Sequence, residues 1–241
     1  MQIVVNHLTR MQKGFMCVAG VDPSTKRHVR PVLGSQMRTS MLARHGGPFE
    51  LGYRVELGET KFAGKVPEIE DRLFEASAAR QLEAVPPDRF WQLISEIAAG
   101  ELREIFGPDL QPIGAASCGV CEFHGLRSLG CYWARTASIR VTTAADHQRI
   151  RFAFEEGQRR YRVPVTDIRL YGEDHVTPDA AAVESLNAAL ADHPRVLVSA
   201  GLSRAYKSSD DMPAVHWLQI NGIHLPPTDS RGPNALQKER S

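Results

Sequence analysis

Short apolar runs of strand length, separated by turn residues, recur along almost the whole chain. Runs of this kind bounded by Gly, Pro, Asp and Ser are typical of antiparallel strands joined by turns. The predicted strands cover residues 3–9, 15–21, 28–33, 53–57, 117–123, 138–143, 149–155, 161–170, 195–201 and 215–223.

Helical periodicity is confined to two stretches. Apolar residues recur at helical spacing between residues 90 and 105, and a Gly-Pro pair at 107–108 follows, which predicts one helix there. A second helix is predicted over 178–191. Strands and helices do not alternate strictly, so the pattern disfavours a Rossmann-like sheet. It favours a mostly β fold of the α+β class, with paired small barrels.

The length of 241 residues fits two compact units better than one small barrel. We expect a first domain over 1–110 that ends in the first helix, a second domain over 111–225, and a flexible polar tail over 226–241. Hydrophobic residues make up 42% and charged residues 24%, which is typical of a globular protein with a buried core. The first residues do not resemble a signal peptide and no apolar run is long enough to span a bilayer, so we expect a cytoplasmic protein without a membrane partner.

Positive charge is concentrated in the second half of the chain, although the net charge is only +1. Residues 125–170 contain nine arginines and four acids. Within them, residues 149–165 predict a hairpin with a turn at 156–157, in which Phe152 pairs with Tyr161 and Ile150 pairs with Val163 to form an apolar face. The opposite face then carries four arginines, namely Arg149, Arg151, Arg160 and Arg162.

Arginines opposite each other on a sheet repel one another unless an anion shares the site. Such a face suits a phosphate backbone, because guanidinium groups bind phosphate oxygens in a bidentate manner and stack on exposed bases. Arg140 joins this face only if the strand register places it there. The alternative is an ordinary solvated face with acids nearby. Nearby aromatic residues such as Tyr206 are candidates for base stacking, or else for core packing.

Motifs for catalysis and metal binding are weak in this sequence. Cys118, Cys121, His124 and Cys131 have the residue types of a zinc site but not the spacing of a zinc knuckle, so buried reduced thiols are favoured and no cofactor is expected. No nucleophile elbow, P-loop, zinc-protease helix or dinucleotide fingerprint occurs. These absences leave the catalytic residues unknown, since nucleases and glycosylases can work with a few scattered side chains.

Several segments resemble one known family. They are HLTRM at 7–11, MCVAGVD at 16–22, HVRPVL at 28–33, EIED at 68–71, YRVPVTDIRL at 161–170 and GLSR at 201–204. Together they are similar to the dual OB-containing family of bacterial proteins. The resemblance implies two tandem OB-like barrels, nucleic-acid binding and a role in anti-phage defence. It also makes Arg10, Arg30 and Arg204 candidate contacts. The alternative for Arg10 and Arg30 is pairing with acids such as Asp22 or Asp71 to stabilise the first barrel.

The first functional hypothesis is therefore a module that binds single-stranded or distorted DNA or RNA through the arginine-bearing hairpin. The alternatives are an enzyme that processes nucleic acid, either a nuclease or a glycosylase acting on modified phage DNA, and an interaction subunit that docks an acidic protein encoded nearby. Salt-sensitive binding of single strands favours the first hypothesis.

Overall fold

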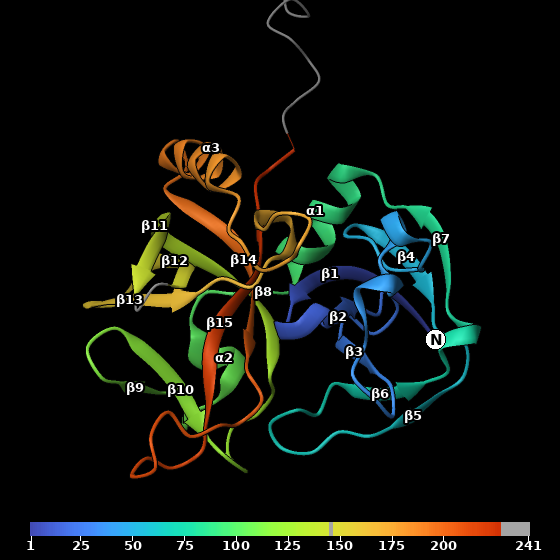
Figure 1. Cartoon of the computed structure of the whole chain (residues 1–241), viewed down its shortest axis with the longest axis horizontal. Helices are drawn as coiled ribbons and strands as arrows, with labels where there is room; N and C mark the ends of the chain where they lie inside the picture. Colours follow the sequence, from blue (N-terminus) through green and yellow to red (C-terminus); the bar gives the residue numbers. More distant parts are fainter. Residues whose placement is uncertain (145–146, 228–241) are drawn as a thin grey trace, which may run out of the picture.

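The computed structural model describes residues 1–144 and 147–227. Within these residues the strands form two curled sheets, each a half-barrel, of seven and eight strands. Figure 1 shows the sheet of the N-terminal half on the right and the sheet of the C-terminal half on the left. The predicted fold class, a mostly β chain with two barrel-like parts in the α+β class, is confirmed. The predicted flexible tail falls almost entirely on residues 228–241, which lie outside the described residues.

The first sheet has the spatial order β5-β6-β3-β2-β1-β4-β7. Its neighbours run antiparallel except for β3 and β6, which are parallel. Alternate residues of β1 point into a core that includes Ile3, Val5 and Phe49. The strands are β1 Gln2–Arg10, β2 Met16–Val21, β3 His28–Val32, β4 Tyr53–Glu56, β5 Thr60–Phe62, β6 Asp71–Phe74 and β7 Arg80–Ala84.

The second sheet has the order β13-β12-β11-β14-β15-β10-β9, and the short strand β8 pairs in parallel with β11. Its core includes the neighbouring, tilted rings of Phe152, Phe154 and Tyr161. The strands are β8 Ala98–Ala99, β9 Gln111–Ile113, β10 Ser117–Cys121, β11 Leu129–Ala144, β12 His147–Glu156, β13 Arg159–Pro164, β14 Arg195–Leu202 and β15 Val215–His224.

The helices are α1 Pro87–Glu96, α2 Leu102–Phe106 and α3 Ala180–Ala191, with single 3-10 turns at Gln12–Gly14, Thr39–Met41, Ala43–His45, Ala76–Ala78 and Ile168–Leu170. The single helix predicted over 90–105 is wrong, because β8 interrupts it and a capping box of Glu101 and Glu104 starts a new helix. In the described residues no helix is long and apolar enough to cross a membrane.

Helix α1 packs against both sheets. Leu93 contacts Val4 and Val21 of the first sheet, whereas Ile94 contacts Cys131 and Leu197 of the second. In Figure 1 the helix accordingly lies between the two halves. The two buried side chains of α1 thus pack against different sheets, so α1 holds the two sheets in one arrangement.

Beneath α1 a buried polar network joins the two sheets. Ser199 Oγ donates to the backbone oxygen of Asn6 at 2.8 Å and lies 2.9 Å from His224 Nε2. Asn6 Nδ2 donates to Ser199 Oγ at 3.2 Å and to Cys131 Sγ at 3.4 Å. Burial, and then the charge of Arg169, lower the pKa of His224 to about 3, so its imidazole is neutral at pH 7.

The protein is expected to lose stability between pH 6.5 and pH 3 as a consequence of His224. The unfolded chain takes up a proton at this residue near its ordinary pKa, whereas the folded chain does so only near pH 3. Lowering the pH from 7 to 5 should therefore reduce the free energy of unfolding by about 2 kcal/mol through this group alone. Urea denaturation at the two pH values should show a smaller difference for His224→Gln. The same change at the exposed His124 should leave the difference as it is.

Candidate functional site

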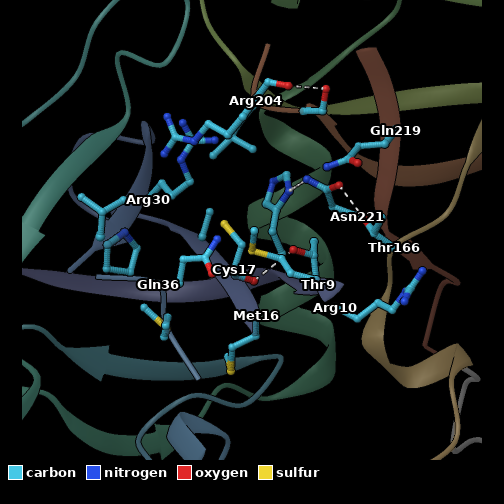
Figure 2. Close-up of a pocket in the computed structure, with 18 of the residues that line it drawn as sticks. Thr9, Arg10, Met16, Cys17, Arg30, Gln36, Thr166, Arg204, Gln219 and Asn221 are labelled. Carbon is cyan, nitrogen blue, oxygen red and sulfur yellow. Dashed lines mark hydrogen bonds between the residues drawn. The ribbon is translucent and has the colours of Figure 1, made fainter. Parts of the chain in front are cut away.

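A pocket of about 700 Å³ lies at the junction of the two sheets. Strands β1, β2 and β3 and the loop at 33–37 form one wall, while β14, β15 and the segment after β13 form the other. Figure 2 shows the side chains of both walls converging on this space. Its volume lies in the range of small-molecule pockets, which is about 300 to 1,000 Å³. We call it the inter-sheet pocket.

The inter-sheet pocket brings together four residues that the sequence singles out. Arg10, Arg30, Arg204 and Tyr206 all line it, although they come from opposite ends of the chain. The Tyr206 side chain is 54% exposed, and its ring centroid lies 6.1 Å from that of Trp217. Tyr206 is thus an accessible aromatic surface at the pocket, as base stacking requires.

Two of these arginines share a buried carboxylate. Arg30 Nε donates to Asp71 Oδ1, and Arg204 Nη2 donates to Asp71 Oδ2 at 2.7 Å. Arg204 Nη1 also lies 2.9 Å from Glu68 Oε1. The ion pair between Arg30 and Asp71, which the sequence analysis gave as the alternative role of Arg30, is therefore present in the structure. The buried Arg30 Nη2, however, has no hydrogen-bond partner among the described residues.

Arg10 has a different environment from Arg30 and Arg204. Its guanidinium carbon lies 4.5 Å from the centre of the Tyr171 ring, and Nη1 donates to the backbone oxygen of His175 at 3.4 Å. Among the described residues it forms no ion pair with a carboxylate. Arg10 thus brings a positive charge to the pocket that no carboxylate of the described chain neutralises.

A buried histidine that the sequence analysis missed also lines the pocket. Burial, and then the neighbouring His28, lower the pKa of His7 well below its ordinary value, so the ring is neutral. Thr166 Oγ1 donates to Asn221 Oδ1 at 3.1 Å, and Asn221 Nδ2 lies 3.3 Å from His7 Nδ1. With the Asn221 amide in this orientation, Nδ1 accepts and the proton of His7 is on Nε2. His7 Nε2 has no partner within the described part of the chain.

The hairpin of β12 and β13 has the predicted faces but not the predicted pairing. Phe152 pairs with Val163 and Phe154 pairs with Tyr161, so the predicted partners of Phe152 and Ile150 are wrong by two residues. The cause is the turn, which lies at Gly157 and Gln158 with Glu156 opposite Arg159. A shift of two residues keeps every side chain on its own face, because side chains alternate with a period of two.

Five arginines consequently lie on one face of β11, β12 and β13. Arg140 of β11 pairs with Arg151, which answers the question of register that the sequence left open. Arg140, Arg149, Arg160 and Arg162 are exposed and Arg151 is half-buried. None of the five forms an ion pair with a carboxylate in residues 1–144 and 147–227. We call this set the arginine face.

The arginine face adjoins the inter-sheet pocket. Burial, and then the charge of Arg149, lower the pKa of the Arg151 guanidinium, and Arg162 lowers it further. The Tyr171 hydroxyl donates to the backbone oxygen of Val165, and the Val165 N–H donates to the backbone oxygen of Ile150, the neighbour of Arg151. The Tyr171 ring in turn lies under the guanidinium of Arg10, which lines the pocket. Tyr171 therefore connects the hairpin with the rim of the pocket.

The candidate zinc ligands do not come together. Among the described residues no group of three or more His, Cys, Asp or Glu has a geometry that could hold a metal ion. Cys131 belongs to the network under α1, and Cys118 lies in the core of the second sheet. Burial raises the pKa of each of these two thiols to about 12, so both are protonated at neutral pH.

Comparison with known proteins does not assign the chain to a family. No family model matches the chain, and no curated protein matches it. One similar solved structure is described as that of a murine DNA binding protein bound with double-stranded DNA. It is 8% identical, and the alignment covers 92% of this chain and 98% of that one with a TM-score of 0.31. A likeness of this size carries no argument about function.

Proposed function

We propose that this protein is a dual OB-containing protein that binds single-stranded or distorted nucleic acid, with the arginine face as the phosphate-binding surface. The observation that carries the proposal is the set of five neighbouring arginines without a carboxylate partner among the described residues. Opposed like charges such as Arg140 and Arg151 destabilise a sheet by a few tenths of a kcal/mol or more. A bound polyanion would remove this repulsion, and this would account for the clustering of arginines on one face of the sheet.

The geometry of the face supports an extended anion over a small one. Arg149 and Arg151 are two residues apart on β12, and Arg160 and Arg162 are two apart on the neighbouring β13. Their Cα atoms are thus separated by about 6 to 7 Å along each strand. Across the strands Arg162 is opposite Ala153 and Arg160 is opposite Glu155, so Arg151 and Arg162 are diagonal neighbours about 7 to 8 Å apart. A row of charges at this spacing matches a chain of phosphates, each of which a guanidinium can bind in a bidentate manner.

The binding surface also offers contacts for bases. Tyr206 is exposed at the inter-sheet pocket, and its ring centroid lies 6.1 Å from that of Trp217. Stacking of a base on an aromatic ring contributes about 1 to 3 kcal/mol and tolerates any sequence. The resemblance of residues 7–33 to the dual OB-containing family is the reason to propose anti-phage defence as the setting for this binding.

Binding of a labelled single strand is expected to weaken about 100-fold between 50 and 200 mM salt, as follows from the release of counterions at about five phosphates. Fluorescence anisotropy with DNA and RNA strands measures this, and a strand with neutral methylphosphonate linkages is the matched control. Poly-glutamate of equal charge tests whether any polyanion suffices, as an acidic protein partner would require. Absence of binding at low salt, or equal binding of the neutral strand, would contradict the proposal. A denaturing gel of the same samples, with and without magnesium, reports any cleavage.

A further inference from the structure

We infer that the inter-sheet pocket is a receptor for one nucleotide, with the base inside the pocket and the phosphate at Arg10. The inference deepens the proposed function and rests on it, since the strand held by the arginine face would supply that nucleotide. A free mononucleotide has the same chemistry, and the experiment below distinguishes the two sources.

Two buried nitrogens without partners belong to side chains that line the pocket. His7 is 1% exposed and Arg30 is 4% exposed, both line the pocket, and the structure gives neither His7 Nε2 nor Arg30 Nη2 a hydrogen-bond partner within the described residues. A buried donor without a partner is destabilising, because it has lost its hydrogen bonds to water and gained none in return. A ligand with acceptor atoms in the pocket would remove that cost, and the ring nitrogens and carbonyl oxygens of a nucleobase are such acceptors.

The side chains of Asn221 and Thr166 fix the orientation of the His7 ring. Asn221 Nδ2 lies 3.3 Å from His7 Nδ1, and Thr166 Oγ1 in turn donates to Asn221 Oδ1. These two contacts hold the ring in place, and with the amide in this orientation the N–H of His7 is on Nε2. Figure 2 shows the hydrogen bond between Thr166 and Asn221 in this chain of contacts. A donor held in this way discriminates between ligands, because a ligand without an acceptor at that point leaves the donor unpaired.

The remaining walls suit a flat ring with polar edges. Thioether side chains, which adapt their shape to a ring, come from Met11, Met16 and Met37. The amides of Gln36 and Gln219 also line the pocket, and among the described residues neither forms a side-chain hydrogen bond to the rest of the protein that would occupy it. A free amide offers one donor edge and one acceptor edge, which is the pairing that Gln makes with a base.

Arg10 is placed to receive the phosphate of the same nucleotide. Its buried Nε has no partner in the described residues, and its guanidinium carbon lies 4.5 Å from the centre of the Tyr171 ring. The Tyr171 hydroxyl donates to the backbone oxygen of Val165, whose N–H donates to the backbone oxygen of Ile150, the neighbour of Arg151. A strand on the arginine face therefore lies within reach of Arg10, where one nucleotide can turn into the pocket.

The test uses a variant that fills the pocket. Gly34 lines the pocket and is exposed, and no atom lies within 4 Å of the position that a Cβ would occupy there. Gly34→Trp should thus fold normally and occupy the space, and Gly34→Ala is the matched control. Should Gly34→Trp fail to fold, Ser35→Trp at the neighbouring exposed position of the lining takes its place.

Two arms distinguish the sources of the nucleotide. In the first, calorimetry measures binding of the four nucleoside monophosphates, with ribose 5-phosphate as the ligand without a base. In the second, a single strand carries one 2-aminopurine, whose fluorescence rises when it leaves the base stack. The Gly34→Trp protein should lose at least tenfold in affinity for the monophosphates, or lose the rise in fluorescence, whereas Gly34→Ala should behave as the parent protein.

Each result has a defined meaning. If Gly34→Trp loses affinity for the monophosphates, the pocket binds free nucleotides. If it loses the rise in 2-aminopurine fluorescence, the pocket binds a base of the bound strand. Salt-dependent strand binding with neither arm sensitive to Gly34→Trp overturns the pocket and leaves the proposed function intact. Nucleotide binding in the pocket without any strand binding overturns the proposed function and leaves the pocket as a site for free nucleotides.

Discussion

Replacing Arg149, Arg160 and Arg162 together by alanine is expected to weaken the binding of single-stranded nucleic acid about 100-fold at 0.1 M salt. All three side chains are exposed on the arginine face, so their removal leaves the core of the second sheet intact. Each phosphate contact to a single strand contributes about 0.7 to the logarithmic salt slope, which corresponds to about a fivefold change in affinity at this salt concentration. The slope itself should therefore fall by about 2. Anisotropy titrations at four salt concentrations measure both quantities.

The matched control removes the same charge elsewhere. All three control residues are exposed: Arg27 lies in the turn between β2 and β3, Arg80 in β7 and Arg89 in α1. Their triple alanine variant has the same net charge as the first, so a general loss of electrostatic attraction would affect both proteins equally. We expect the control to bind within about threefold of the parent protein, since long-range attraction alone is screened at this salt. Equal losses in the two variants would refute a localised phosphate-binding surface.

Removing the carboxylate of Asp71 is expected to destabilise the fold by about 3 to 5 kcal/mol. Asp71 is buried and accepts hydrogen bonds from both Arg30 and Arg204. In Asp71→Ala the buried guanidinium of Arg30 keeps its charge but loses its partner, and an unpaired buried charge is the costly state. Urea denaturation followed by circular dichroism measures the change in the free energy of unfolding.

A second variant separates the unpaired charge from lost packing. Arg30→Met combined with Asp71→Ala removes both charges, and we expect it to recover more than half of the stability that Asp71→Ala loses. At the surface, Glu83→Ala breaks the exposed pair with Arg54 and should cost about 1 kcal/mol or less. If the double variant is as unstable as Asp71→Ala, then the charge of Arg30 is not the cause of the loss.

The arginine face could be predicted from the sequence because its signal is local. Alternation of apolar and basic residues assigns each side chain of β12 and β13 to a face, and this assignment survives an error of two residues in the pairing. The place of Arg140 could not be predicted in the same way. It lies on β11, so its position depends on how two strands pair rather than on the alternation within one.

The strands of residues 60–84 were missed because they lack an alternating pattern. All five residues of β7 are exposed, and β5 has one half-buried residue followed by two exposed ones. Edge strands of this kind are held by backbone pairing with a neighbour, which leaves little trace in the sequence. The helix predicted over 90–105 failed for a related reason, since pairing of β8 with β11 overrides the helical spacing.

The inter-sheet pocket could be predicted only in part. Three of its arginines follow from the resemblance to a known family, but nothing local marks His7 or Asn221 as neighbours. They meet because β1 and β15 lie side by side across the junction of the sheets. A tertiary contact between the two ends of a chain has no periodicity to reveal it. Hydrogen bonding between an Asn and a His in the first and last strands would require covariation among homologues to detect.

Strand β11 sets a fixed separation between the two parts of the proposed binding surface. Leu129 at its start lines the inter-sheet pocket, and Arg140 near its end belongs to the arginine face. Between these two residues β11 contains a β-bulge, where the step from Arg135 to Ser138 lies opposite the shorter step from Glu155 to Ala153 of β12. A bulge absorbs one extra residue that would otherwise turn every later side chain to the opposite side of the sheet. Relatives that accommodate a longer or shorter ligand are therefore expected to change the length of β11 at this bulge or in steps of two residues.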